Sequence, residues 1–151
     1  MYVSKELSTI NDKDTLFSRV ISLCSEIFEA DNVTLRIWEN DMLHPVAFLA
    51  QTVPERRSLP SGEGFSGSVF AEQKSSLIYD LSQNSKYLDP GENTLCVICA
   101  PISVREDKLG TLAVEKGTSH FYKNDDLEIL EAMAAQIALA ILSARLITGI
   151  L

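Results

Sequence analysis

The stretch Pro60-Ser-Gly-Glu-Gly-Phe-Ser-Gly-Ser-Val-Phe-Ala71 lies near the middle of this 151-residue chain and decides how the segments around it are arranged. Its glycines permit a tight turn, because glycine adopts backbone angles that other residues avoid. The apolar residues that follow predict a short helix. Because this helix would interrupt a series of strands, we expect it to close one face of a sheet.

Two strands are predicted before this stretch. Asn32 to Trp38 alternates and is rich in β-branched side chains, which is typical of a strand. A turn at Glu39-Asn-Asp41 leads into Met42 to Gln51, which we expect to be the antiparallel partner. Thr52 to Ser61 contains two prolines and two arginines and is predicted to be a loop.

Three more strands are predicted after it. Ser76 to Asp80 is a brief apolar strand, and the polar segment Leu81–Asn93 that follows is expected to be irregular. Thr94 to Val104 is strongly apolar, and we expect Pro101 to interrupt it because proline cannot donate to a strand ladder. Leu109 to Glu115 is predicted to be the last strand.

A helix is predicted near each end of the chain. Between Thr15 and Phe28 the apolar residues fall at helical spacing, with Asp14 as the expected N-cap. From Asp125 to Leu146 a longer helix carries two apolar rows. One row is enough to dock a helix on a sheet, and the second suggests a helix from another chain as its partner. The docking row is Leu127, Leu130, Ala134, Ile137, Ile141 and Ala144, and the second is Ala135, Leu139, Leu142 and Leu146.

This order of elements predicts an α+β fold. The terminal helices would cover one face of an antiparallel sheet, and the short helix and the Leu81–Asn93 segment would roof the other. A sheet face roofed by loops is a natural pocket for a small molecule. We expect residues 15–146 to form the domain, 1–14 to be a helical lead-in and 147–151 to begin a linker.

Composition and charge exclude several classes of protein. Hydrophobic residues make up 46% of the chain, so a folded core is expected. No apolar run reaches the roughly 20 residues that cross a bilayer, and the N-terminus lacks a secretory signal, which predicts a cytoplasmic protein. An odd count of three cysteines suits free thiols in a reducing compartment. The net charge of −8 argues against nucleic acid or an anionic membrane as a partner.

Five local patterns follow one another in a characteristic order. Gly62-Glu-Gly-Phe-Ser-Gly-Ser-Val69 forms a glycine-rich helix start, and Leu77-Ile-Tyr-Asp80 is a short strand ending in Asp. Together these patterns resemble the GAF domain family over Thr15 to Leu146. The other three are the apolar-Pro-Ile ending of Leu95 to Ile102, the glycine-led strand Leu109-Gly-Thr-Leu-Ala-Val114, and the final helix with Ala134-Ala-Gln-Ile-Ala138.

The resemblance implies a regulatory module that binds a small molecule and forms a homodimer through its terminal helices. Such modules usually lie N-terminal to an output domain, such as a cyclase, a diguanylate cyclase, a histidine kinase or a phosphodiesterase. An output domain is therefore an expected partner in the full-length protein. Whether the chain is a fragment or a complete protein stays open.

A subset of the family binds cyclic nucleotides and carries an N-K-x(n)-F-x(3)-D-E pattern. Lys116, Phe121 and Asp125 fit that spacing. Glu115 and Asp126 replace the Asn and the final Glu. The resemblance implies a buried clamp of Lys116 and Asp125 behind the pocket, and cAMP or cGMP as the ligand. The alternative is that Phe121 and Asp125 only begin the last helix, where Asp125 would face the helix dipole.

Seven residues are expected to line the ligand pocket by their positions. Two come from the sheet, two begin the short helix, whose first amides suit an anionic oxygen, and three lie on or beside the roof. The two phenylalanines among them have an alternative role as core residues. A carboxylate that reads a purine from the last strand would lie near Ala113, which is apolar. The seven are Thr34, Phe48, Phe65, Ser66, Asp80, Tyr87 and Thr94.

The cysteines suggest an alternative activity. Some small GAF proteins reduce free methionine sulfoxide with cysteines at the pocket, and Cys96-Val-Ile-Cys99 places two thiols close in sequence. On a strand, residues three apart point to opposite faces, so we expect buried structural thiols and no catalytic residue. His44 and His120 have no close-spaced ligand partners, so no metal or other cofactor is expected.

Three functions therefore stay open. The leading one is a sensor, most simply for a cyclic nucleotide, that signals through its terminal helices. The second is an enzyme of the free methionine sulfoxide reductase type. The third is a ligand-free dimerisation module, in which Phe48 and Phe65 would fill the pocket.

Overall fold

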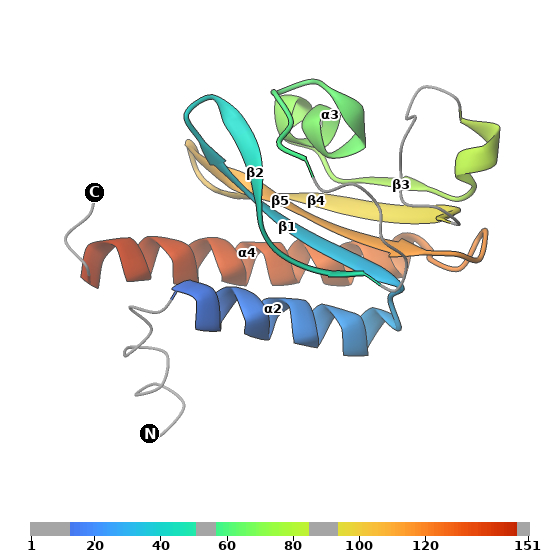
Figure 1. Cartoon of the computed structure of the whole chain (residues 1–151), viewed down its shortest axis with the longest axis horizontal. Coiled ribbons are helices and arrows are strands. Elements are labelled where there is room, and N and C mark those ends of the chain that lie inside the picture. Colours follow the sequence, from blue (N-terminus) through green and yellow to red (C-terminus); the bar gives the residue numbers. More distant parts are fainter. Residues whose placement is uncertain (1–12, 51–56, 85–93, 148–151) are drawn as a thin grey trace.

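The fold is an antiparallel sheet between two layers of helices (Figure 1). A computed structural model describes residues 13–50, 57–84 and 94–147. Its five strands lie in the order β2-β1-β5-β4-β3, and every neighbouring pair is antiparallel. The predicted α+β class and the order of elements are confirmed. The elements are α2 (Lys13–Phe28), β1 (Asn32–Glu39), β2 (Met42–Ala50), α3 (Gly64–Glu72), β3 (Ser76–Ile78), the 3-10 turn η1 (Leu81–Gln83), β4 (Cys96–Val104), β5 (Asp107–Lys116) and α4 (Asn124–Ile147).

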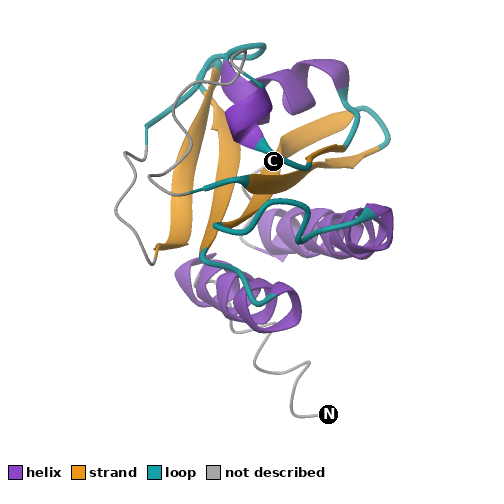
Figure 2. Cartoon of the chain, turned by 90° about the vertical axis from the view of Figure 1, so that its right-hand side faces the viewer, coloured by secondary structure: helices purple, strands orange, loops and turns teal. Residues whose placement is uncertain are grey.

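Helices α2 and α4 cover one face of the sheet, and α3 covers the other, as the turned view shows (Figure 2). The alternation of side chains along β1 follows this division. Val33, Leu35 and Ile37 lie in the main hydrophobic core with α2 and α4. The residues between them must point to the α3 side, because successive side chains of a strand face opposite ways. These residues are Asn32, Thr34 and Arg36.

The main core forms where α2 and α4 pack on the sheet. Most of the predicted docking row of α4 is buried there, and Leu127 packs partly buried against it. Tyr122, just before α4, meets the ring of Phe28 edge-on at 6.1 Å, and its hydroxyl donates to the Phe28 carbonyl oxygen at 3.0 Å. Each fully buried aliphatic or aromatic side chain contributes about 1.5–3 kcal/mol, so this layer carries most of the stability.

Most of the second apolar row of α4 lies on the outer surface of the helix layer, whereas Leu142 packs partly buried against the main core. Leu139 is 53% exposed and Leu146 is 64% exposed, and on α2 Leu23 and Ile27 are also exposed. By length and composition alone, α4 could cross a membrane, although the core helices of soluble proteins pass the same test. The large apolar side chains that α4 exposes are Ile129, Leu139 and Leu146.

Three details differ from the prediction. Strand β4 runs through Pro101 to Val104 without a break. Strand β3 pairs only with Val97, Ile98 and Cys99 of β4, so the stretch around Pro101 has an open edge, where a missing N–H can be tolerated. Strand β3 ends at Ile78, because Asp80 turns to cap η1. Asp14 lies inside the first turn of α2 and not before it.

Gly110 lies in the middle of the sheet, opposite Ile37 on β1 and Ile102 on β4. A Cβ atom at this position would run into the backbone carbonyl oxygen of Arg36, and the backbone of a central strand cannot give way. We predict that Gly110→Ala lowers the free energy of unfolding by about 3 kcal/mol, as overpacking does in a core. Urea unfolding followed by circular dichroism measures the loss.

Gly62→Ala is the matched control. A Cβ at Gly62 meets nothing within 4 Å, and only its positive φ of 89° opposes the substitution. Backbone strain of this kind costs about 1 kcal/mol. Equal losses for the two variants would contradict the steric role of Gly110.

Candidate functional site

The face of the sheet under α3 carries several buried polar side chains beside a small apolar cluster of Val69, Cys99 and Ala113. Strand pairing places Thr34 beside Ala113, and Ala113 beside Cys99. Buried polar groups need hydrogen-bond partners, so a row of them beneath a short helix marks the candidate site. We call these residues the polar face: Asn32, Thr34 and Arg36 on β1, Cys99 on β4, and Thr111, Ala113 and Glu115 on β5.

A cluster of Asn32, Thr94 and Glu115 forms one end of the polar face. The Asn32 amide donates to Glu115 Oε1 at 3.0 Å and to Thr94 Oγ1 at 3.3 Å. The Thr94 hydroxyl donates to the same Glu115 oxygen at 3.3 Å. Asn32 and Thr94 are 1% and 6% exposed, so both donors hold one carboxylate oxygen from inside the protein. Within the described ranges, Glu115 Oε2 accepts no hydrogen bond and no cation pairs with the carboxylate.

The other end of the polar face is closed by packing. The ring of Phe70 on α3 stacks on Trp38 at 4.6 Å, above a small apolar cluster with Leu43 and Leu59. Arg36 is buried beside this cluster, and its Nε donates to the Arg57 carbonyl oxygen at 3.3 Å. Between the two ends, Val69 and Phe65 of α3 pack on Cys99 and Ala113.

Helix α3 contributes two of the predicted site residues. Ser66 is 6% exposed, and its hydroxyl accepts a hydrogen bond from the Cys99 thiol at 3.7 Å. Phe65 packs against two small clusters, one around Val69 and Cys99 and the other around Ile78. Ser66 therefore reaches the polar face directly, whereas Phe65 fixes α3 on the sheet as a core residue.

The remaining predicted pocket residues have different surroundings. Thr34 is buried on the polar face, and Phe48 lies directly opposite it on β2 with 54% of its surface exposed. Asp80 Oδ1 accepts from the backbone N–H of Ser82 at 3.0 Å and from its hydroxyl at 2.6 Å, so this carboxylate caps η1. Tyr87 lies outside the described residues. The structure thus brings Thr34, Ser66 and Thr94 to the polar face and gives Asp80 a local structural role.

Lys116 has a different carboxylate partner from the one predicted. Its Nζ donates to the Glu29 carbonyl oxygen at 2.6 Å, lies 3.7 Å from Asp31 Oδ1 and sits 4.6 Å from the centre of the Phe121 ring. Asp125 is exposed in the first turn of α4, where its charge suits the helix dipole. The predicted Lys116–Asp125 pair is therefore wrong, although Lys116 and Phe121 do lie together. This group ties β5 to the connection between α2 and β1.

Asn32 and Glu115 are site residues that the sequence patterns did not indicate. Glu115 stood out only as a departure from the Asn of the cyclic-nucleotide pattern. The sequence could have indicated Glu115 as a site residue through its position two residues after Ala113, because residues two apart on a strand share a face. A carboxylate is therefore present on the α3 side of β5, two residues after the expected position.

The three cysteines are buried and free. Cys96 lies in the helix-side core, where its sulfur accepts from the Tyr122 backbone N–H at 3.4 Å, whereas Cys99 lies on the polar face. Burial raises the pKa of the Cys24 and Cys99 thiols to about 12 and also raises the pKa of Cys96. A thiol of this kind carries little thiolate at neutral pH, so it is a poor nucleophile.

The described ranges hold no group of three or more His, Cys, Asp and Glu side chains that could bind a metal ion. The two histidines have structural contacts. His44 Nδ1 lies 2.7 Å from Ser58 Oγ, and its Nε2 lies 3.0 Å from the Glu39 carbonyl oxygen. His120 stacks on Tyr79 with ring centres 5.4 Å apart. Both rings therefore serve to join neighbouring segments.

Comparison with known proteins gives a family and a set of similar structures. The model of the GAF domain family matches residues 12–141. No curated protein matches the sequence. The GAF domain of a phosphoenolpyruvate-protein phosphotransferase from Coxiella burnetii is 20% identical, with a TM-score of 0.78, and the match covers 97% of this chain and 96% of that one.

Several of the similar structures are enzymes. The type II free methionine-R-sulfoxide reductase from Thermoplasma acidophilum is 20% identical, with a TM-score of 0.75, over 85% of this chain and 94% of that one. The free methionine-R-sulfoxide reductase from Neisseria meningitidis is 15% identical, with a TM-score of 0.78, over 85% of this chain and 77% of that one. At these identities the likeness concerns the fold.

The raised thiol pKa values predict how stability depends on pH. In the unfolded chain a thiol ionises near its ordinary pKa of 9.0, whereas Cys24 and Cys99 stay protonated in the fold up to about 12. The stabilisation is therefore complete below pH 9 and is lost as the pH rises from 9 to 12. Between pH 9 and pH 10, ionisation of each of these two thiols in the unfolded chain lowers the free energy of unfolding by about 1 kcal/mol.

Urea unfolding at pH 7, 9 and 10 tests this dependence, with Cys99→Ala as the comparison. The variant is less stable at every pH because it leaves a cavity, but its further loss between pH 9 and 10 should be smaller by about 1 kcal/mol. A wild type and a variant with the same pH slope would contradict the buried, protonated state of Cys99.

Proposed function

The chain belongs to the GAF domain family, a regulatory fold that binds small molecules, and we propose that it is a sensor whose ligand binds against the polar face. The observation that carries this proposal is the arrangement of Glu115. One of its oxygens is held by Asn32 and Thr94, and within the described residues its second oxygen has no donor and its charge has no cation. Glu115 is only partly buried and already accepts from two donors on one oxygen, and a ligand with N–H groups would add partners for its second oxygen.

We propose a cyclic nucleotide, cAMP or cGMP, as that ligand. A purine carries N–H donors on its edge, which match the acceptor that Glu115 offers. Helix α3 starts at Gly64 after a residue, Glu63, that makes no side-chain cap hydrogen bond, and the free N–H groups of a helix start suit a phosphate. Thr34, Ser66 and Thr94 of the predicted site support this proposal, and Phe48, Phe65, Asp80 and Tyr87 are further proposed members, whereas Lys116 and Phe121 lie together at the connection between α2 and β1.

Isothermal titration calorimetry with cAMP and with cGMP tests the ligand. We expect heat of binding with at least one of them, and Glu115→Gln should weaken the binding about 10- to 100-fold. This range follows from the loss of a charge-assisted hydrogen bond of about 1.5–3 kcal/mol. Glu106→Gln makes the same chemical change at an exposed position in the β4–β5 turn and should bind like the wild type.

Absence of both heat and any shift in melting temperature, with either nucleotide at millimolar concentration, would exclude cyclic nucleotides. Ligand at 100 times its dissociation constant adds about 2.7 kcal/mol of stability, so a true ligand cannot escape detection by melting.

The terminal helices are the proposed output of the sensor. Three members of the second, outer row of α4 are exposed, namely Ala135, Leu139 and Leu146, and α2 adds the exposed Leu23 and Ile27. Residues at alternating spacings of three and four along a helix pair with a second helix in coiled coils. We propose that two copies of the chain meet through this surface in the cytoplasm, and that α4 passes their arrangement to a C-terminal output domain.

Leu139 tests the proposed dimer. It is 53% exposed in the single chain, so a charge there leaves the fold intact but is buried when two copies pair. We predict that Leu139→Glu raises the dimer dissociation constant at least about tenfold, as measured by sedimentation velocity. Val46→Glu adds the same charge at an exposed apolar residue of β2 and should leave the dimer unchanged. A wild-type chain that still sediments as a monomer at 100 times the protein concentration used to compare the variants would contradict the dimer.

Two other functions have specific support. Cys99 lies on the polar face next to Ser66, which is where a reductase of free methionine sulfoxide would need a thiol. Its burial and its raised pKa oppose this activity. Turnover of free methionine sulfoxide that is lost in Cys99→Ser would therefore replace the sensor proposal by an enzyme.

The packing of Phe65 between two clusters supports a ligand-free dimerisation module, which predicts a dimer that binds no nucleotide.

A further inference from the structure

Helices α3 and α4 lie on opposite faces of the sheet (Figures 1 and 2). The proposed ligand lies on the α3 side, whereas the proposed dimer surface lies on the α4 side. Strand β4 separates the two helices, because α3 and α4 pack on its two faces. A direct connection between them must therefore pass around the edge of the sheet.

The sheet edge at β4 is open for this purpose. Strand β3 covers only Val97, Ile98 and Cys99, so β4 continues to Val104 without a strand on its outer side. The connection from α3 to β3 runs past this open edge. A groove of about 490 Å³ lies there, bounded by this connection, by Pro101 and Ser103 of β4, and by α4.

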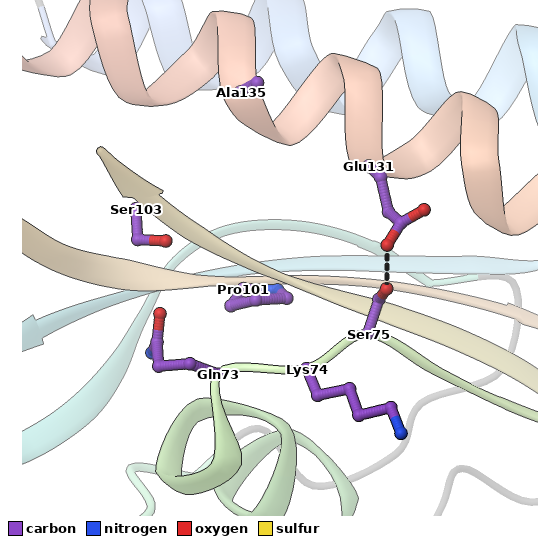
Figure 3. A pocket seen from close by; sticks show the side chains of 7 residues that line it. All are labelled: Gln73, Lys74, Ser75, Pro101, Ser103, Glu131 and Ala135. Carbon is purple, nitrogen blue, oxygen red and sulfur yellow. Dashed lines mark hydrogen bonds between the residues drawn. The ribbon is translucent and has the colours of Figure 1, made fainter. Parts of the chain in front are cut away.

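One hydrogen bond crosses this groove. The Ser75 hydroxyl, on the connection, donates to the Glu131 carboxylate, on α4, and the two side chains point toward one another (Figure 3). Glu131 is one helical turn from Ala135, which also lines the groove and belongs to the outer row of α4. The bond therefore reaches α4 next to the proposed dimer surface.

The connection is held firmly to the end of α3. Gln73 has a left-handed backbone with a φ of 53°, and both its backbone N–H and its side-chain amide donate to the Phe70 carbonyl oxygen, at 3.3 and 2.8 Å. The Lys74 N–H donates to the Val69 carbonyl oxygen at 3.3 Å. A displacement of α3 is therefore carried to Ser75 two residues later, and is not absorbed by a loose loop.

We propose that the Ser75–Glu131 hydrogen bond couples α3 to α4, so that ligand on the polar face changes the pairing of the terminal helices. Ser66, near the start of α3, touches the polar face, and Ser75 follows its end, so one short helix spans the distance. The hydrogen bond is made in one ligand state and released in the other, which supplies the two-state element that such coupling requires. This inference rests on the proposed sensor function.

The test compares the dimer dissociation constant with and without saturating cGMP or cAMP, whichever binds, by sedimentation velocity. In the wild type we expect the nucleotide to change the constant about tenfold, a typical size for coupling between sites. In Ser75→Ala the nucleotide should still bind with the same affinity within about twofold, but the change in the dimer should fall below about twofold. Glu131→Ala should behave in the same way.

Two controls separate this role from general damage. Ser103→Ala removes another hydroxyl from the same groove and should keep the full response. Glu131→Gln keeps an oxygen that accepts from Ser75 and should keep a measurable part of the response. If Ser75→Ala acted only by destabilising the fold, a Ser103→Ala variant with the same fall in melting temperature would lose the response of the dimer as well.

A full response in Ser75→Ala would overturn the coupling. A nucleotide that binds the wild type without changing the dimer would also overturn it, and would leave the ligand proposal standing. Absence of nucleotide binding to the wild type would overturn the ligand proposal and this inference together.

Discussion

The alternation of side chains along β1, β5 and β4 is the constraint on which the rest of the structure depends. Successive residues of a strand point to opposite faces, so each central strand serves the helix-side core and the polar face at once. On β5, Leu112 and Val114 enter the core, whereas Ala113 and Glu115 face α3. A slip of one residue would exchange the two sets and put the Glu115 charge under α2 and α4. The register that determines the fold therefore also determines the site.

The parts of the molecule that depend on near neighbours could be predicted from the sequence. Helical spacing identified α2, α4 and the two rows of α4, because a row of apolar residues requires only the geometry of one helix. Alternation and the glycine-rich turn identified the strands and α3 for the same reason. Pro101 was misjudged, since proline breaks a strand only where its missing N–H faces a neighbour. Whether an edge is open depends on the length of β3, a segment about 25 residues away.

The partners within the site could not be predicted, because they depend on strand pairing over long stretches of chain. Asn32 and Glu115 are 83 residues apart in sequence and meet only because β1 and β5 pair in one register. The same pairing brings Asp31 to Lys116, where the family pattern suggested Asp125. Asp31 is the carboxylate partner of Lys116 because it comes immediately before β1. The pairing of Asn32 with Glu115 therefore places Asp31 beside the end of β5.

The same sheet limits how a ligand signal can cross the molecule. On strand β4, Cys99 belongs to the polar face, whereas Ile98 and Ala100 pack against α4 in the main core. A signal through the sheet would therefore have to move a strand that is packed on both faces. Packed interiors are stiff, and shifting such a strand would strain both cores. An edge contact can change without disturbing either core, since Ser75 and Glu131 meet outside them. The shortness of β3, which leaves the edge open at Pro101, is therefore what permits a weak and reversible link between α3 and α4.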